Sequence, residues 1–185
     1  VLVTTTRVTS SGARRAAKLS TCARHSWVCT SHAPAAPHAL ASFAPSSGML
    51  ASQLQTRMSD ASVMAPHEWY AHGTCSGVTP PEYFRIAADL ADQAGTVLDP
   101  LFAAARGRDI SSRTVREAVA TRLGPDAGRR VALTCRDSSG GAVVYEVRLS
   151  LPAVVELRAG PGPVSLRDAL AHGPAIPPGC GRAGV

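Results

Sequence analysis

The pattern of apolar and polar positions predicts strands at the two ends of the chain and helices between them. The opening segment, VLVTTTRV, is rich in β-branched residues and predicts a strand. Residues 9–48 are rich in Ser, Ala and Pro and follow neither a helical nor a strand period. A structureless stretch of that length is uncommon inside a compact domain, so we predict no element there.

Helical spacing becomes clear from the middle of the chain onward. The segment EYFRIAADLADQAG, residues 82–95, follows two prolines and carries apolar residues at helical spacing. The next segment, VLDPLFAAARG, predicts a separate short helix that is broken near Pro100. Ser111 or Ser112 is the expected N-cap of a helix with the sequence SRTVREAVATRLG. Shorter helical turns are predicted at 49–58, 67–72 and 166–170.

Two further strands are predicted near the C-terminal end. VALTCR at 131–136 and VVYEVRLSL at 143–151 read as strands, joined by a Ser-Ser-Gly-Gly turn at 138–141. The tail from Pro152 is rich in Pro and Gly and predicts loop, apart from the helical turn already named. Strands at both ends with helices between them favour the α+β class. The length favours a single domain over residues 1–185.

Composition narrows the class of protein. Hydrophobic residues make up 45% of the chain, which argues against disorder. No apolar run approaches the roughly 18 residues of a membrane span, so no membrane partner is expected. The net charge of +6 comes almost wholly from arginine, because Lys18 is the only lysine. Such a charge attracts polyanions such as RNA, although a GC-rich genome also produces arginine-rich chains.

The cysteines indicate the compartment. Cys22 and Cys29 are too far apart for the usual zinc knuckle. The simplest arrangement of the five is two disulfides and one remaining thiol, which implies an oxidising compartment. We therefore expect a secreted or periplasmic protein. The five are Cys22, Cys29, Cys75, Cys135 and Cys180.

Residues 67–75, HEWYAHGTC, concentrate groups that can carry chemistry. Each residue of an α-helix advances by about 100°, so Glu68 and His72 are neighbours one turn apart. His67 lies about 140° from His72 and reaches the same site only from the helix edge. A histidine exchanges protons near neutral pH, and a neighbouring carboxylate orients it and raises its pKa. The motif therefore predicts an acid/base site.

A zinc protease is the rival interpretation of this motif. Zinc proteases use HExxH, which places two histidines at i and i+4 on one helix face. Here the two histidines are at i and i+5, which turns the second one away on an α-helix. We therefore predict no metal and no other cofactor. A capped helix whose side chains only pack would explain each residue alone, but not the whole motif.

The same nonapeptide resembles the second active-site motif of the ribonuclease T2 family, HEW-x-K-HGTC. The likeness continues in register from about Met58 to Leu151. CSGVTPPEYF is similar to the family's turn into a Tyr-Phe helix, RDISSRTVREAV to its next helix, and ALTC with VYEVRLS to its late strand pair. The resemblance implies an α+β domain with a central antiparallel sheet packed against several helices. It also implies endonucleolytic cleavage of RNA through a 2′,3′-cyclic phosphate, without metal.

The resemblance assigns a role to each matching residue. His72 corresponds to a general acid/base residue, while Glu68 and His67 bind and polarise the phosphate. Trp69 supports the helix from behind. RNA supplies its own nucleophile, the ribose 2′-hydroxyl, so these groups are sufficient if a second histidine is present. We expect RNA as the partner and a monomeric protein.

The resemblance also implies two disulfides. Cys135 would pair with Cys180, and Cys75 with an upstream cysteine, Cys29 before Cys22. Bonded cysteines have Cα atoms about 4.4–6.8 Å apart. Ser150 stands where some members of the family have a cysteine, so one family disulfide is expected to be absent.

The chain departs from the family at residues that complete the site. Ala71 stands where the family has a lysine, which removes a positive charge near the phosphate. The family's first motif, HGLWP, is absent, and the string HSW beginning at His25 is the nearest candidate. His32 and His38 are further candidates for the second acid/base histidine.

These departures keep a second hypothesis open. The chain would then be a catalytically impaired T2-like protein that binds RNA, because phosphate contacts supply most of the affinity. Loss of one partner of an acid/base pair typically costs about 10²–10⁴-fold in rate. A histidine from residues 9–48 lying beside His72 would favour the enzyme. Residues 9–48 either diverge from the family or are read in a shifted frame. A shifted frame would explain both the odd number of cysteines and the missing periodicity.

Overall fold

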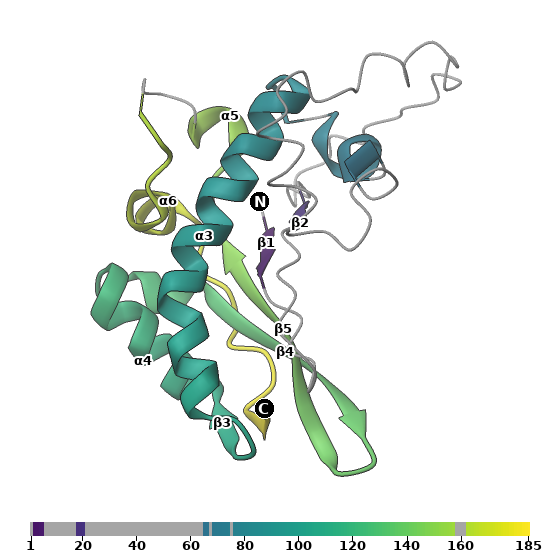
Figure 1. Cartoon of the computed structure of the whole chain (residues 1–185). Helices are drawn as coiled ribbons and strands as arrows, with labels where there is room; N and C mark the ends of the chain where they lie inside the picture. The colour runs from purple at the N-terminus through teal and green to yellow at the C-terminus, as the bar shows by residue number, and fades with distance from the viewer. Residues whose placement is uncertain (1, 6–17, 21–64, 67, 75, 158–161) are drawn as a thin grey trace.

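The computed structural model describes residues 2–5, 18–20, 65–66, 68–74, 76–157 and 162–185, and for 2–5, 18–20 and 71 it describes the backbone only. Helices and strands are segregated (Figure 1). The helix α3 (Pro80–Ala104) runs along the sheet, and α4 (Ser112–Leu123) and α6 (Leu166–His172) lie beside α3. The predictions of a helix at 49–58 and of most of the structureless stretch 9–48 lie outside the described residues. One short strand does lie within that stretch, where no element was predicted.

The six strands form one sheet in the order β2-β1-β5-β6-β3, with β4 pairing to β5. Most pairs are antiparallel, and a single parallel pair, Val143 with Gly184, joins β5 to β6. β1 pairs with β5 from Leu2 opposite Ser150, so two segments far apart in the sequence lie side by side in the sheet. The strands are β1 (Leu2–Thr5), β2 (Lys18–Ser20), β3 (Asp109–Ser111), β4 (Val131–Ser138), β5 (Gly141–Ser150) and β6 (Arg182–Gly184).

The β4–β5 hairpin confirms the predicted pair of late strands and their turn. Leu133 lies opposite Val147, and Val131 lies opposite Leu149. These four side chains are buried, because paired residues project from the same face of a sheet and that face meets the helices. Along β4 the pairing register shifts between Thr134 and Cys135.

The long helix α3 (Pro80–Ala104) spans two segments that were predicted to be separate helices. Pro100 lies inside it, so the predicted break is wrong. Proline removes the hydrogen bond to the carbonyl four residues earlier, which here belongs to Thr96. Both Pro100 and Thr96 lie on the exposed side of α3, where water can satisfy that carbonyl. Buried Leu98 and Phe102 meanwhile continue the apolar face across the proline.

The helix α4 (Ser112–Leu123) begins and ends as predicted. The Ser111 side chain accepts a hydrogen bond from the backbone N–H of Thr114, which satisfies one of the orphan donors of the first turn. Gly124 caps the other end with a φ of 112°, a conformation that favours glycine.

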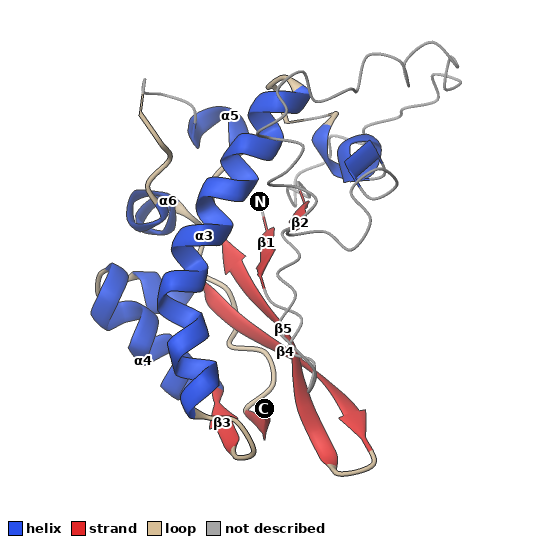
Figure 2. Cartoon of the chain, viewed as in Figure 1, coloured by secondary structure: helices blue, strands red, loops and turns tan. Residues whose placement is uncertain are grey.

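The remaining helical segments are short. The tail was predicted as loop with one helical turn, and the structure adds a second turn and the strand β6. These segments are η2 (Trp69–Gly73), η3 (Ala127–Arg130), α5 (Val154–Leu157) and α6 (Leu166–His172). Figure 2 shows that the helices α3, α4 and α6 cover the same side of the sheet.

The core lies between α3, α4 and the sheet. Each large side chain that is fully buried contributes about 1.5–3 kcal/mol relative to exposure. The largest of them are Tyr83, Ile86, Leu90, Leu98, Val115, Val119, Leu149, Leu151, Leu166 and Leu170. Within the described part of the chain, no helix is both long and apolar enough to span a membrane.

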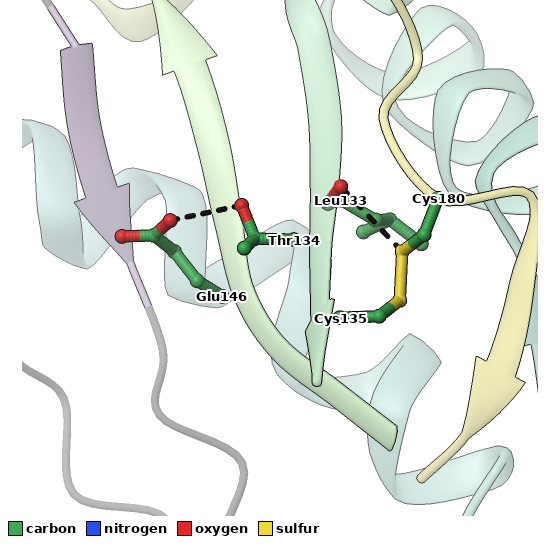
Figure 3. The surroundings of a disulfide bond; sticks show 5 residues. All are labelled: Leu133, Thr134, Cys135, Glu146 and Cys180. Atoms are coloured by element: carbon green, nitrogen blue, oxygen red, sulfur yellow. Dashed lines mark hydrogen bonds between the residues drawn. A yellow bond between two sulfur atoms is a disulfide. The ribbon is translucent and has the colours of Figure 1, made fainter. Parts of the chain in front are cut away.

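A disulfide joins the C-terminal segment, residues 173–185, to β4. Cys135 and Cys180 are bonded with their Cα atoms 6.0 Å apart, as predicted (Figure 3). The Leu133 backbone donates to Pro178 O at 2.9 Å and accepts from Cys180 N at 3.1 Å. Gly179 has a φ of 79°, and a Cβ there would lie 1.9 Å from the Leu133 oxygen, so only glycine permits this approach. The predicted partners of Cys75 lie outside the described residues.

Candidate active site

The motif segment forms a π-helical turn rather than an α-helix. In η2 the Thr74 N–H donates to Trp69 O at 3.0 Å, a bond that spans five residues. The helical turn predicted at 67–72 is confirmed from Trp69 onward, but its α-helical spacing is wrong. A π-turn is wider than an α-turn, so residues five apart come closer to alignment than the α-helical spacing implied. Such turns are rare and are frequent at functional sites.

Glu68 and His72 face one another across this turn. His72 Nε2 lies 3.8 Å from Glu68 Oε2, which is an ion-pair distance once the imidazole is protonated. The Glu68 side chain is 7% exposed and the His72 side chain 21% exposed. The carboxylate is therefore inside the protein, while the imidazole reaches the surface where a substrate could approach. The predicted proximity of these two groups is confirmed.

Aromatic packing fixes η2 against the start of α3. The Trp69 ring meets the Tyr83 ring edge-on at 5.7 Å between centroids, and Tyr83 meets Phe84 in the same way at 5.2 Å. Edge-to-face pairs of this kind add about 0.5–1.5 kcal/mol beyond their burial. The predicted supporting role of Trp69 agrees with this contact.

Gly73 permits the close packing of the Trp69 indole. A Cβ at position 73 would lie 2.2 Å from Trp69 Cε3, so any other residue would displace the ring. The Gly73 carbonyl accepts hydrogen bonds from both the backbone N–H and the hydroxyl of buried Ser76. These contacts fix the turn that carries His72.

Tyr83 is a buried core residue whose hydroxyl lies near the Glu68 carboxylate. Burial raises the pKa of the Tyr83 hydroxyl well above its ordinary value, and the neighbouring Glu68 carboxylate raises it further. The hydroxyl is therefore neutral under all physiological conditions. Sequence reasoning missed Tyr83 and Ser76 as parts of this site, although both follow the motif within CSGVTPPEYF.

The structure describes only part of the predicted site. His67, Cys75 and the candidate histidines His25, His32 and His38 lie outside the described residues. Among the residues that the structure describes, no group of three or more His, Cys, Asp or Glu side chains could hold a metal ion. η2 lies close to β2 and to the start of α3, so the site is at one end of the sheet (Figure 1).

Comparison with known proteins rests on structure, since no protein-family model and no curated protein matches the chain. Ribonuclease MC1 from the seeds of bitter gourd aligns with a TM-score of 0.55 and 19% identity, covering 80% of this chain and 85% of that one. A tyrosine-to-alanine mutant of ribonuclease MC1 in complex with 5′-UMP aligns over little more than half of either chain, 54% of this one and 55% of that one. That second alignment has a TM-score of 0.45 and 25% identity.

The alignment with a TM-score of 0.55 defines the fold. Ribonuclease MC1 is a member of the ribonuclease T2 family, so the described chain has a ribonuclease T2-like α+β fold. The fold class expected from the sequence is confirmed, including the mainly antiparallel sheet packed against helices.

Proposed function

We propose that the protein is an endoribonuclease that cleaves single-stranded RNA by acid/base transphosphorylation through a 2′,3′-cyclic phosphate. The observation that carries this proposal is the pairing of buried Glu68 with surface-reaching His72 at 3.8 Å, on a π-turn within a T2-like fold. The net charge of +6 supports RNA as the partner.

The proposed reaction needs two proton transfers. A base removes the proton of the ribose 2′-hydroxyl, the resulting oxygen attacks the adjacent phosphorus, and an acid protonates the departing 5′-oxygen. We assign His72 to one of these transfers, because its imidazole reaches the surface and a histidine side chain can both accept and donate a proton. Glu68 holds the imidazole in position, since the two side chains lie 3.8 Å apart.

The second half of the proposed site includes His67 together with a second acid/base histidine, for which His25, His32 and His38 are the candidates. Ala71 provides no cation at the position of the family lysine, so charge on the phosphorane must be stabilised by other groups. The proposal includes metal independence, and cleavage in excess chelator is the expected result.

The proposed setting is an oxidising compartment, either extracellular or periplasmic. The Cys135–Cys180 disulfide supports this assignment, because disulfides persist mainly where thiols are not kept reduced.

The test is a comparison of two histidine variants. We expect His72→Ala to lower the cleavage of a homopolymeric RNA by about 10²–10⁴-fold. His172→Ala is the matched control, because His172 is an exposed histidine on α6 and hydrogen-bonds to Asp168 O. The 2′,3′-cyclic product would be identified by phosphorus NMR. Equal activity of the folded His72 variant and the wild type would refute the assignment.

A second candidate function is RNA binding without turnover. The observation that favours it is the replacement of the family lysine by Ala71. Salt-dependent binding of RNA by the wild type, with no cyclic product formed, would select this alternative.

A further inference from the structure

A shallow cavity of about 360 Å³ lies between α4, η3 and the C-terminal segment. Its charged lining consists of Arg113, Arg116, Arg129 and Glu117. The volume is at the lower end of the range for small-ligand pockets. α4 and η2 lie on opposite sides of α3 (Figure 1), so this cavity belongs to a different surface from the candidate active site.

Arg116 is held rigidly at this cavity by backbone carbonyls. Its Nε donates to Gly128 O at 2.7 Å, and its Nη2 donates to Arg129 O and to Ile176 O, both at 3.0 Å. The Nη1 group makes no hydrogen bond to another described residue. No described carboxylate lies within 4 Å of this guanidinium either, so its positive charge is solvated by dipoles and is not neutralised. The Nε and Nη2 edge of the guanidinium is therefore fixed in position by the carbonyls, and the two N–H donors of Nη1 remain available.

The neighbouring charges leave the cavity cationic. Glu117 accepts a hydrogen bond from Arg113 Nε at 2.7 Å, so the only carboxylate in the lining is already paired. The exposed side chain of Arg129 makes no ion pair or hydrogen bond with the described residues. Two of the three guanidinium groups that line the cavity are therefore uncompensated.

We propose that this cavity is an anion site that takes one phosphate group. The free Nη1 group of Arg116 carries two N–H donors, and hydrogen bonds from a charged guanidinium to phosphate oxygens are among the stronger ones in proteins. The three carbonyl bonds orient Arg116 before any ligand arrives, so little side-chain entropy is lost on binding. Arg129 can then approach the phosphate from the exposed side. The ligand is free phosphate or a phosphate of a polynucleotide, and both present negatively charged oxygens around a tetrahedral phosphorus.

The experiment is an NMR titration of the full chain at low ionic strength with two separate probes. One probe is inorganic phosphate, and the other is a short DNA oligonucleotide, which lacks the 2′-hydroxyl and is not cleaved. We expect saturable shifts of the amide signals of Gly128 and Arg129 with at least one probe. Binding by phosphate alone identifies a small-anion site, whereas binding by the oligonucleotide identifies a polynucleotide site.

Two charge-matched variants provide the control. Arg129→Gln removes a cavity cation without touching the carbonyls that hold Arg116, and we expect affinity to fall roughly tenfold. Arg122→Gln removes the same charge from the exposed side of α4, outside the cavity lining, and should leave affinity within about twofold because exposed charges are screened. His72→Ala should bind like the wild type, which separates this site from the proposed catalytic one.

Two results would overturn the proposal. One is the absence of a saturable shift at η3 with both probes. The other is equal weakening by Arg129→Gln and Arg122→Gln, which would mean a diffuse attraction to the positive surface. In either case Arg116 serves only to join α4 to η3 and to the C-terminal segment.

Discussion

At the scale of single residues, the candidate site depends on small groups as much as on its acid and base. Gly73 lies against the Trp69 indole, and Tyr83 lies beside Glu68. The first contact joins residues four apart in one turn, whereas the second depends on where α3 packs. The pair Glu68 and His72 was predictable, since four-residue spacing brings side chains together on any helical turn. Tyr83 was not, since nothing in the sequence fixes which face of the next helix meets the motif.

We predict that Gly73→Ala destabilises the protein by about 1–3 kcal/mol, the usual cost of overpacking. The added methyl group would overlap Trp69 Cε3, from which a Cβ lies only 2.2 Å away. Urea denaturation measures the change. Gly140→Ala is the control, because nothing lies within 4 Å of a Cβ at that position. The packing argument fails if the two variants lose the same stability.

We predict that the free energy of unfolding falls as the pH rises above about 10, where an unfolded tyrosine ionises. The pKa of Tyr83 is raised in the folded state, so the native protein retains a proton that the unfolded chain releases. The contribution of Tyr83 to the free energy of unfolding is therefore fully present below the unfolded pKa and is lost as the pH rises above it. Tyr83→Phe should reduce this alkaline slope, and Tyr70→Phe, at an exposed tyrosine, should not. An unchanged slope in the Tyr83 variant would contradict the prediction.

At the scale of elements, the predictable parts are those with strong local signals. The Ser111 cap and Gly124 mark both ends of α4, and apolar segments on either side of a Ser-Ser-Gly-Gly turn mark β4 and β5. The strands β3 and β6 are only three residues long, too short for a period, and they form because the fold brings them together. The π-turn at η2 was not predictable from the local sequence either, because its wider hydrogen-bonded turn depends on how Trp69 packs.

Pro100 provides a test at the same scale. We predict that Pro100→Ala stabilises the protein by about 0.5–2 kcal/mol, less than the roughly 3 kcal/mol that proline costs in a helix interior. The gain is reduced because proline also restricts the unfolded chain. Thermal unfolding measures the effect. Pro80→Ala is the control, since Pro80 occupies the first position of α3, where proline is well tolerated. Equal effects at both positions would contradict this account of α3.

At the scale of the whole molecule, the C-terminal segment is joined to the sheet by one covalent bond and a series of backbone contacts. The Cys135–Cys180 bond spans 45 positions of the chain. The family resemblance predicted this pair, and the Pro- and Gly-rich sequence around it gave no sign that the segment also supplies β6. Its placement is a property of the complete fold.

We predict that replacing Cys135 and Cys180 together by Ser lowers stability by about 4 kcal/mol in the chain-entropy model, given their separation of 45 residues. Guanidinium denaturation with and without a reducing agent measures the effect. Reduction should destabilise the wild type by a similar amount and have a smaller effect on the double variant. A double variant as stable as the oxidised wild type would show that the backbone contacts of Leu133 hold the segment without the bond.

The pairing of β1 with β5 determines when the sheet can form during synthesis. Leu2 lies opposite Ser150, so the first strand leaves the ribosome long before the strand that it must pair with. At about 5–20 residues per second, that delay is on the order of ten seconds. Among the strands that the structure describes, β2 is the one neighbour of β1 made early in synthesis, and the other is β5. Because long-range pairing slows folding, the sheet that carries the candidate site is completed only after β5 and β6 have been made.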